Sequence, residues 1–330
     1  MKRTMKRSTR DDVTAWLDGL SQRFTLIAPQ AVEEQVLYRP VAGSSEIAFD
    51  FSRTDLPVKE YFLPATHVLF SVERGEEGVS VEEPSLDGER VVFGLRPCDA
   101  RALRVLDALF LEEEPVDPYY AERRERTALI GLACREMGEE CFCTSLGLAP
   151  DDASDVDLML TELADGYAVQ VVTEKGERIL GDLTLEEIEG TPPKPAVREK
   201  TPILEPEAWP QHFEHVYWAR VADRCLSCRL CTYVCPTCRC FDVRDYETPN
   251  GDIERLRAWD SCMAEGYRRI AGGHNPRPTK AQRLRNRFYC KFCYYPRDFG
   301  PVACVGCGRC IAQCPVNVDV VEVLEGVAAL

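Results

Sequence analysis

Two stretches of sequence decide the fold, CLSCRLCTYVCP at residues 225–236 and CVGCGRCIAQCP at residues 304–315. Both have the spacing Cys-x2-Cys-x2-Cys-x3-Cys-Pro. Two residues between successive cysteines let a tight loop place three thiolates on neighbouring corners of a cubane of iron and sulfide, which takes four thiolates in all. Each run therefore predicts a [4Fe–4S] centre.

The fourth cysteine of each run is expected to serve the cluster of the other run, as in ferredoxins with two clusters. A zinc site takes four tetrahedral ligands and does not explain the doubled arrangement. Pro236 and Pro315 would turn the chain away after each fourth ligand, and Gly306 and Gly308 would let the backbone approach sulfide. The predicted ligands are Cys225, Cys228, Cys231 and Cys314 for cluster I, and Cys304, Cys307, Cys310 and Cys235 for cluster II.

The chain has 330 residues and 17 cysteines, an odd number that excludes complete pairing within the chain. Its length suggests about two domains. We find no run of 18 apolar residues and so predict no membrane span. The basic N-terminal residues are not followed by the apolar segment of a secretory signal. Cysteines at metal-ligand spacing in such a chain indicate the reducing cytoplasm, where thiols are ligands or redox groups.

Residues 1–180 are predicted to form an α/β domain. Asp99 is expected to cap a helix over 100–110, and the order strand, helix, strand favours a partly parallel sheet. The predicted strands are short apolar runs at 46–51, 67–72, 91–95 and 128–133, and a hairpin of 158–163 with 167–173.

A proline-rich linker at 181–210 is expected to be extended. Residues 211–330 are expected to form a mostly helical, dicluster ferredoxin-like domain with an insertion between Cys235 and Cys304. Residues 1–205 carry a net charge of −18 and residues 206–330 one of +3, which suggests different partners for the two halves. Residues 268–297 hold nine basic residues and no acidic one, a candidate docking surface for an acidic partner.

Four further cysteines lie in the predicted α/β domain. Cys98 follows the strand at 91–95 and Cys134 follows the strand at 128–133, so neighbouring parallel strands would bring both to one sheet edge, where α/β folds bind ligands. Cys141 and Cys143 follow closely. We interpret the four as a third [4Fe–4S] site, with zinc and buried free thiols as alternatives.

Five cysteines and three arginines remain near the two runs. Cys238, Cys240, Cys262, Cys290 and Cys293 are expected to pack beside the clusters, with a fourth metal site as the alternative. An oxidised cluster with four thiolates carries a charge of about −2, so nearby cations should stabilise its reduced form. Arg229, Arg239 and Arg309 lie inside the motifs and are the candidates for this role.

Other functional motifs are missing. The sequence has no GxGxxG, P-loop, GxSxG or CxxCH motif, so we predict no flavin, NAD or haem site in this chain. A strongly acidic chain without a recognised motif is not expected to bind nucleic acid. The sequence predicts carriers of electrons but no place for a substrate.

Several longer stretches carry a family resemblance. They are KEYFLP at 59–64, GLRPCD at 94–99, DPYY at 117–120, CFCT at 141–144, CPTCRCF at 235–241, WDSC at 259–262, GGHN at 272–275 and CVGCGRC at 304–310. In these the chain resembles the iron–sulfur subunits that include the β subunit of cytoplasmic NAD(P)-linked [NiFe] hydrogenases (sulfhydrogenases) and the A subunit of anaerobic sulfite reductase.

The resemblance implies an electron-transfer subunit between two partners. One would be a reductase subunit that binds FAD and NAD(P), and the other a hydrogenase small subunit or the catalytic subunit of sulfite reductase. It also supports a cluster at Cys98, Cys134, Cys141 and Cys143. The alternative function is an enzyme that reduces sulfur or disulfides by itself, at a cluster or at Cys238, Cys240 or Cys262.

Overall fold

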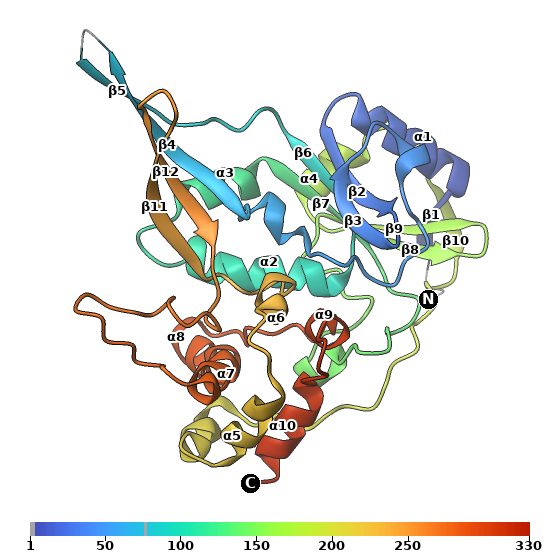
Figure 1. Ribbon diagram of the computed structural model, residues 1–330. Helices are drawn as coiled ribbons and strands as arrows, with labels where there is room; N and C mark the ends of the chain where they lie inside the picture. The colour runs from blue at the N-terminus through green and yellow to red at the C-terminus, as the bar shows by residue number, and fades with distance from the viewer. Residues whose placement is uncertain (1–3, 76–77) are drawn as a thin grey trace.

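The computed structural model describes residues 4–75 and 78–330, which form two β-sheets and a helical region (Figure 1). Sheet A has the strand order β10-β1-β9-β8-β7-β6-β2-β3. Its strands are β1 (Thr4–Thr9), β2 (Thr25–Val32), β3 (Gln35–Pro40), β6 (Arg90–Leu95), β7 (Thr127–Leu132), β8 (Leu158–Leu163), β9 (Gly166–Val171) and β10 (Glu186–Glu189). Sheet B is made of β4 (Thr66–Gly75), β5 (Gly78–Glu82), β11 (Phe241–Glu247) and β12 (Ile253–Trp259).

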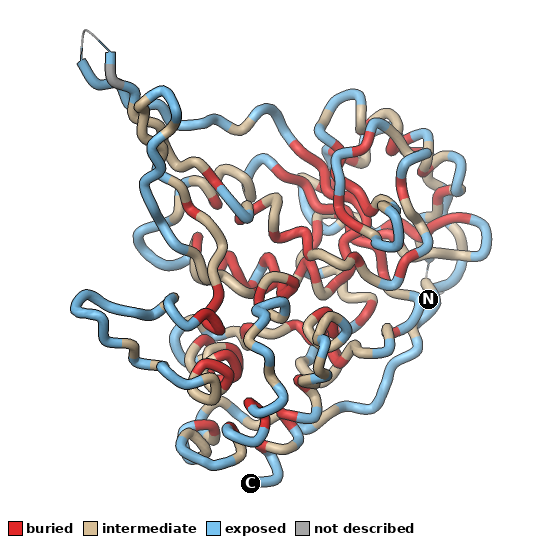
Figure 2. Tube along the Cα trace, viewed as in Figure 1, coloured by how far each residue is buried: buried red, intermediate tan, exposed pale blue. Residues whose placement is uncertain are grey.

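The centre of sheet A is parallel and apolar. β2, β6, β7 and β8 run in the same direction, and every residue of β6 and β7 is buried. A strand that is buried on both faces has a continuous apolar sequence, which is why these strands could be predicted from the sequence. Figure 2 shows the buried segments concentrated in this sheet and in the helix that crosses below it.

Helices cover both faces of sheet A. α1 (Arg10–Ser21) and α4 (Glu174–Leu180) pack on the face that carries Val91 and Phe93. α2 (Pro97–Phe110) and α3 (Pro118–Glu125) pack on the opposite face with Val92 and Leu129. Successive residues of β6 therefore feed two separate cores, as the pleat of a strand requires.

Several expected elements are confirmed. The runs at 91–95 and 128–133 are β6 and β7, the hairpin is β8 with β9, and the sheet is partly parallel. The helix expected at 100–110 begins earlier, at Pro97, because proline suits the first helical position. Its N-cap is Arg96, so Asp99 lies inside the first turn and is not the cap.

Two strand predictions need correction. Residues 46–51 are not a strand, because they follow a 3-10 turn (Ser44–Glu46) as a loop that buries Ile47 and Phe51 in the core. A loop that packs its apolar residues into the core has the same short apolar run in its sequence as a buried strand. The run at 67–72 is a strand but belongs to sheet B, not to the parallel sheet.

Sheet B joins the two halves of the sequence. β12 pairs with β4 along the strand from Ile253–Val72 to Ala258–Thr66, and β11 pairs with β12. The segment between Cys235 and Cys304 therefore contains a β-hairpin, and residues 211–330 are not helical throughout. Most of β11 is exposed, so its sequence lacks the apolar alternation of a half-buried strand.

The proline-rich segment is fixed to the protein at both ends. β10 pairs with β1, and Trp209, in a 3-10 helix (Pro206–His212), is fully buried against the C-terminal helices. These helices are α5 (Tyr217–Arg224), α6 (Leu230–Tyr233), α7 (Lys280–Tyr289), a π-helical turn (Cys290–Tyr294), α8 (Tyr295–Phe299), α9 (Arg309–Ala312) and α10 (Val320–Ala328). No helix in the described ranges 4–75 and 78–330 is long and apolar enough to span a membrane.

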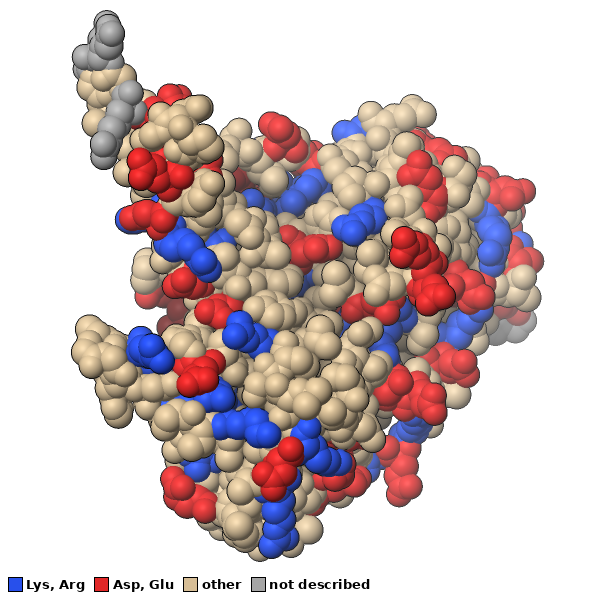
Figure 3. Space-filling view, viewed as in Figure 1, with Lys and Arg blue, Asp and Glu red and all other residues tan. Residues whose placement is uncertain are grey.

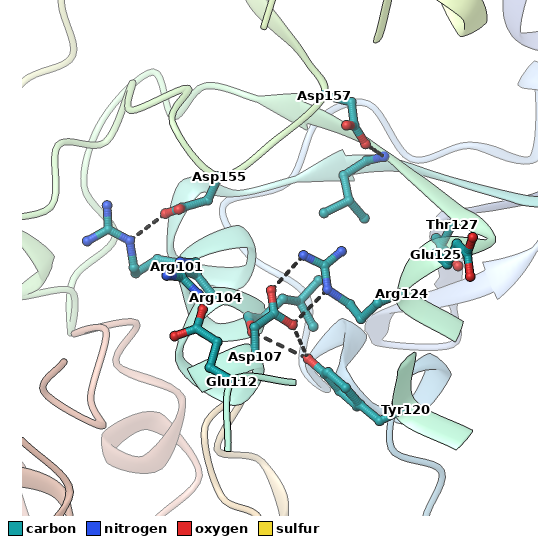
Figure 4. Close-up of polar contacts among 12 residues, drawn as sticks. Arg101, Arg104, Asp107, Glu112, Tyr120, Arg124, Glu125, Thr127, Asp155 and Asp157 are labelled. Atoms are coloured by element: carbon teal, nitrogen blue, oxygen red, sulfur yellow. Dashed lines mark hydrogen bonds and ion pairs between the residues drawn. The ribbon is translucent and has the colours of Figure 1, made fainter. Parts of the chain in front are cut away.

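A buried carboxylate ties α2 to α3 (Figure 4). Asp107 accepts hydrogen bonds from Nε and Nη2 of Arg124, both at 2.8 Å, and its Oδ1 accepts another from the Tyr120 hydroxyl at 2.8 Å. The Asp107 side chain is 7% exposed and that of Arg124 is 21% exposed. Removing the carboxylate would leave Nε and Nη2 of Arg124 without this acceptor in a largely dry site, and the Tyr120 hydroxyl would keep only the Leu103 carbonyl, at 3.3 Å.

We predict that Asp107→Ala lowers the free energy of unfolding by about 2–4 kcal/mol, because the Arg124 charge loses its partner. Urea denaturation measures the change. Glu112→Ala is the control, since it removes the half-exposed ion pair with Arg104 and should cost less than about 1 kcal/mol. Equal losses in the two variants would contradict the prediction.

Candidate iron–sulfur centres

The two cysteine runs fold into matching loops. In the first, Arg229 has φ of 72° and precedes α6; in the second, Gly308 has φ of 74° and precedes α9. Each loop therefore turns at a left-handed residue after its second cysteine. The four-residue helix that follows carries the third cysteine and ends just before the fourth. α6 and α9 lie against each other, so the two runs are neighbours in space.

The predicted ligands of cluster I lie around one cavity. Cys225, Cys228, Cys231 and Cys314 all line it, together with Cys310 from the other run. Cys228 is exposed, so this cavity lies close to the surface. The backbone N–H of Ser227 donates to Cys225 Sγ at 3.3 Å, and that of Val318 donates to Cys314 Sγ at 3.1 Å. Donors to sulfur are the contacts that a bound thiolate needs.

The predicted ligands of cluster II lie deeper. Cys235 and Cys307 are buried. Burial raises the pKa of Cys304 to about 11 and that of Cys310 to about 12, and the charge of Cys235 adds to both increases. Burial also raises the pKa of Cys307, and the charge of Cys235 contributes to the increase. The charge of Cys235 therefore acts on the other three thiols of the set, whose buried environment keeps thiols protonated unless metal binds them.

The four N-terminal cysteines also converge. Cys98, in the first turn of α2, and Cys134, just after β7, meet at the carboxyl edge of the parallel strands, as their positions in the sequence predict. Cys141 and Cys143 complete the set, and all four line one cavity. Burial, with the charges of Cys141 and Cys134, raises the pKa of Cys143 to about 12.

Arg96 fixes this sheet edge. Its buried guanidinium donates from Nη1 to the carbonyl oxygens of Leu132 and Ala133, at 3.1 and 2.9 Å. These carbonyls end β7, whereas Arg96 itself follows β6, so one side chain holds the two strand ends in position. Because Cys98 and Cys134 are each two residues from one of these contacts, Arg96 sets where both sulfurs lie.

The third cysteine set touches the cluster II set. Cys307 lines the same cavity as Cys98 and Cys134, and the Phe142 N–H donates to the Gly306 carbonyl at 2.9 Å. A Cβ on Gly306 would lie 2.5 Å from the backbone nitrogen of Cys143. The absence of a side chain at Gly306 and Gly308 admits the backbone of the 140–143 loop, and the close approach of sulfide expected at these glycines stays a prediction.

The three motif arginines have different surroundings. Arg229 is exposed and lines the cluster I cavity. Arg239 lies over the Tyr295 ring at 4.0 Å and donates to Cys290 Sγ at 3.5 Å. Arg309 is buried and donates from Nη1 and Nη2 to both oxygens of Asp99, at 2.8 and 2.7 Å, and from Nη2 to the Thr54 hydroxyl at 2.8 Å. Its charge is thereby paired with a carboxylate.

Sequence reasoning missed two buried cations that do contact cysteine sulfur. Arg287 Nε lies 3.2 Å from Cys231 Sγ, and Lys291 Nζ lies 3.2 Å from Cys235 Sγ. Both belong to the basic stretch 268–297, in which Arg283 is buried as well, so only the other six basic residues are left to form a docking surface. The available signal was periodicity: Leu284, Arg287, Phe288 and Lys291 recur at helical spacing, which places these cations on an apolar face.

The five remaining cysteines lie beside these sets. Cys262 and Cys293 are buried, and Cys238, Cys240 and Cys290 are partly exposed. A hydrogen bond from Cys262, aided by one from the Tyr267 hydroxyl, lowers the pKa of Cys240 to about 6. Cys238 lies next to Cys235, with which it shares a hydrogen bond. None of the 17 cysteines forms a disulfide.

Comparison with known proteins supports a dicluster domain in the C-terminal part of the chain. Residues 224–318 match the family model of the 4Fe-4S dicluster domain. The chain is 36% identical over 304 residues to the sulfhydrogenase 2 subunit beta of Pyrococcus furiosus, which covers 88% of each chain. No solved structure matches the chain.

We predict that Gly306→Ala lowers the free energy of unfolding by about 2–3 kcal/mol more than Gly272→Ala does, as measured by urea denaturation. Both glycines have positive φ, 63° and 87°, so both variants carry the same kind of backbone strain. Only at Gly306 does the added methyl meet another segment, because nothing lies within 4 Å of a Cβ at Gly272. Similar losses would show that the two loops do not press on each other.

Proposed function

The chain belongs to the iron–sulfur subunit family of the sulfhydrogenase beta subunit, and from this premise we propose that it relays electrons through three [4Fe–4S] clusters. The electrons would pass between a subunit that binds FAD and NAD(P) and a catalytic subunit, either a hydrogenase small subunit or a sulfite or sulfur reductase. We place the relay in the cytoplasm, where its 17 thiols stay available as ligands.

One observation carries the proposal: the cluster II cysteines lie between the other two sets. Cys310 of this set also lines the cluster I cavity, and Cys307 also lines the cavity of the N-terminal set. A [4Fe–4S] cluster, when bound, accepts and returns one electron. Three such sites in contact form an uninterrupted row through the protein.

The chain itself would hold, shield and separate the sites. The buried set in the middle excludes water, whereas the exposed Cys228 puts cluster I within reach of a partner. Figure 3 shows acidic side chains most numerous over the sheet A end of this face, with basic side chains among them. The two ends of the row thus lie in parts of the chain that differ in charge, and we propose that they meet different partners.

A second function is favoured by the Cys240 thiol. A cysteine whose pKa lies near 6 is largely thiolate at neutral pH and is therefore a nucleophile. Cys240 would attack an S–S bond of a polysulfide, forming a persulfide and releasing the shortened polysulfide. Two electrons, delivered one at a time by the clusters, and one proton would then release hydrosulfide and restore the thiolate. Turnover of polysulfide by the purified chain without partners would support this alternative. The relay function predicts no such turnover.

Iron, acid-labile sulfide and zinc per chain test the relay directly in protein purified without oxygen. We predict about 12 iron with equal sulfide and no zinc. Cys141→Ser is expected to lower iron to about 8 by emptying the N-terminal site. Cys293→Ser is the control, because this thiol belongs to no predicted set, and it should keep the full content. About 8 iron in the unaltered chain would refute the third cluster.

We also predict that dithionite bleaches the visible absorbance of the purified chain, whereas NADH and NADPH do not, because the chain is proposed to lack a flavin site. Adding an NAD(P)H-dependent flavin reductase subunit should make NAD(P)H effective. Bleaching by NADH or NADPH alone would contradict the division of labour between subunits.

A further inference from the structure

Two buried cations from the same helical segment contact two predicted ligands of the first cysteine run. Arg287 contacts Cys231 and Lys291 contacts Cys235, and in both pairs the residues are 56 positions apart in the sequence. Cys231 lies in α6 and Cys235 lies two residues beyond its end, four positions further along the chain, and the two cations are likewise four positions apart, in α7 and the π-helical turn. The two contacts are therefore in register, and the two segments run in the same direction.

The two contacts serve different clusters. Cys231 is the third ligand of the first run and belongs to cluster I, whereas Cys235 is the fourth and belongs to cluster II. Each cluster therefore has one buried cation at one of its sulfurs. Among residues 4–75 and 78–330, no carboxylate hydrogen-bonds to either cation, in contrast to Arg309, whose charge is paired with Asp99.

The Lys291 ammonium is fixed by three acceptors. Its Nζ lies 3.2 Å from Cys235 Sγ, 2.9 Å from the Thr237 hydroxyl and 3.0 Å from the Ala303 carbonyl. An ammonium has three protons, so all of its donors are used. Thr237 also lies 3.3 Å from Cys235 Sγ. The charge is thereby held at the sulfur of the most deeply buried set.

Arg287 is held as firmly. Its Nε donates to Cys231 Sγ at 3.2 Å, and its Nη2 donates to the Cys231 carbonyl at 2.8 Å. The helix that carries both cations is anchored by the fully buried Trp209, whose ring stacks on Phe292 at 5.5 Å and meets Tyr289 at 5.2 Å. A rotation of the helix that carried either cation toward solvent would disrupt this aromatic packing.

We propose that Arg287 and Lys291 set the reduction potentials of clusters I and II separately, each by hydrogen-bonding one cysteine sulfur of its own cluster. Reduction adds one electron and so increases the negative charge of a site that is already anionic. A fixed cation at the sulfur stabilises the reduced form more than the oxidised form and raises the potential. Burial alone would push the potential of cluster II below that of the more exposed cluster I, and Lys291 opposes this difference. The inference rests on the proposed function.

Redox titration followed by EPR tests the pairing of cations with clusters. Arg287→Gln and Lys291→Met remove one charge and its donors while keeping most of the side-chain volume. Each is expected to lower one midpoint potential so that the ratio of reduced to oxidised cluster at a fixed potential falls about tenfold, which is about 59 mV for a one-electron couple. The two variants should move different midpoints.

Arg285→Gln is the matched control. It removes the same charge from the same helix, but Arg285 lies over the Phe213 ring at 3.5 Å and pairs with Glu214, away from the cysteines. Its midpoints should equal those of the unaltered chain. The charge-retaining variants Arg287→Lys and Lys291→Arg should give midpoints between those of the unaltered and the neutral variants.

Two results would overturn the inference: unchanged midpoints in variants that keep their iron, or a shift of the same single midpoint by both variants. If Arg287→Gln or Lys291→Met loses iron, the charge-retaining variant at the same position tests the inference in its place. A purely structural role predicts that every variant that keeps its clusters has the midpoints of the unaltered chain, whereas the inference predicts a shifted midpoint. Iron and sulfide measured beforehand separate the two proposals, since absent clusters in the unaltered chain would refute the relay itself.

Discussion

The arrangement of this protein depends on how it accommodates negative charge in its interior. Ten of the twelve cysteines predicted as ligands line two cavities that share the second cysteine run, and as thiolates around clusters the twelve would bring several charges into a region with little water. Cations from segments far apart in sequence lie close to these cysteines and would offset the negative charge. Lys59 is an example: its buried Nζ donates to the carbonyls of Cys235 and Cys238 at 3.1 and 3.0 Å and lies 3.8 Å from the centre of the Trp259 ring.

This constraint explains why the two halves of the chain interlock. Lys59 from the first half contacts the end of the first cysteine run, and Asp99 from the first half pairs with Arg309 of the second run. Sheet B takes β4 and β5 from one half and β11 and β12 from the other. The structure that surrounds the cysteines is thus built by both halves together.

What could be predicted from the sequence depended on short-range spacing. The two cysteine runs predict their ligands because a loop of two residues between thiolates has few other uses. The strands β6 and β7 could be predicted because both of their faces are buried. The convergence of Cys98 with Cys134 followed from the geometry of parallel strands. The pairing in sheet B could not be found in this way, because its strands are far apart in sequence and because β5 and most of β11 are exposed. The surroundings of Arg287, Lys291 and Arg309 depend on contacts with residues that are distant in sequence. Arg309, for example, pairs with Asp99.

The contact between the 140–143 loop and the second cysteine run also has a consequence for how the protein is made. Cys141 leaves the ribosome 166 residues before Cys307, whose carbonyl it contacts. Until the C-terminal residues are synthesised, the cavity of the N-terminal cysteines lacks the wall formed by Gly306 and Cys307. The cavity is therefore complete only after residues 306 and 307 have been synthesised and have packed against the 140–143 loop.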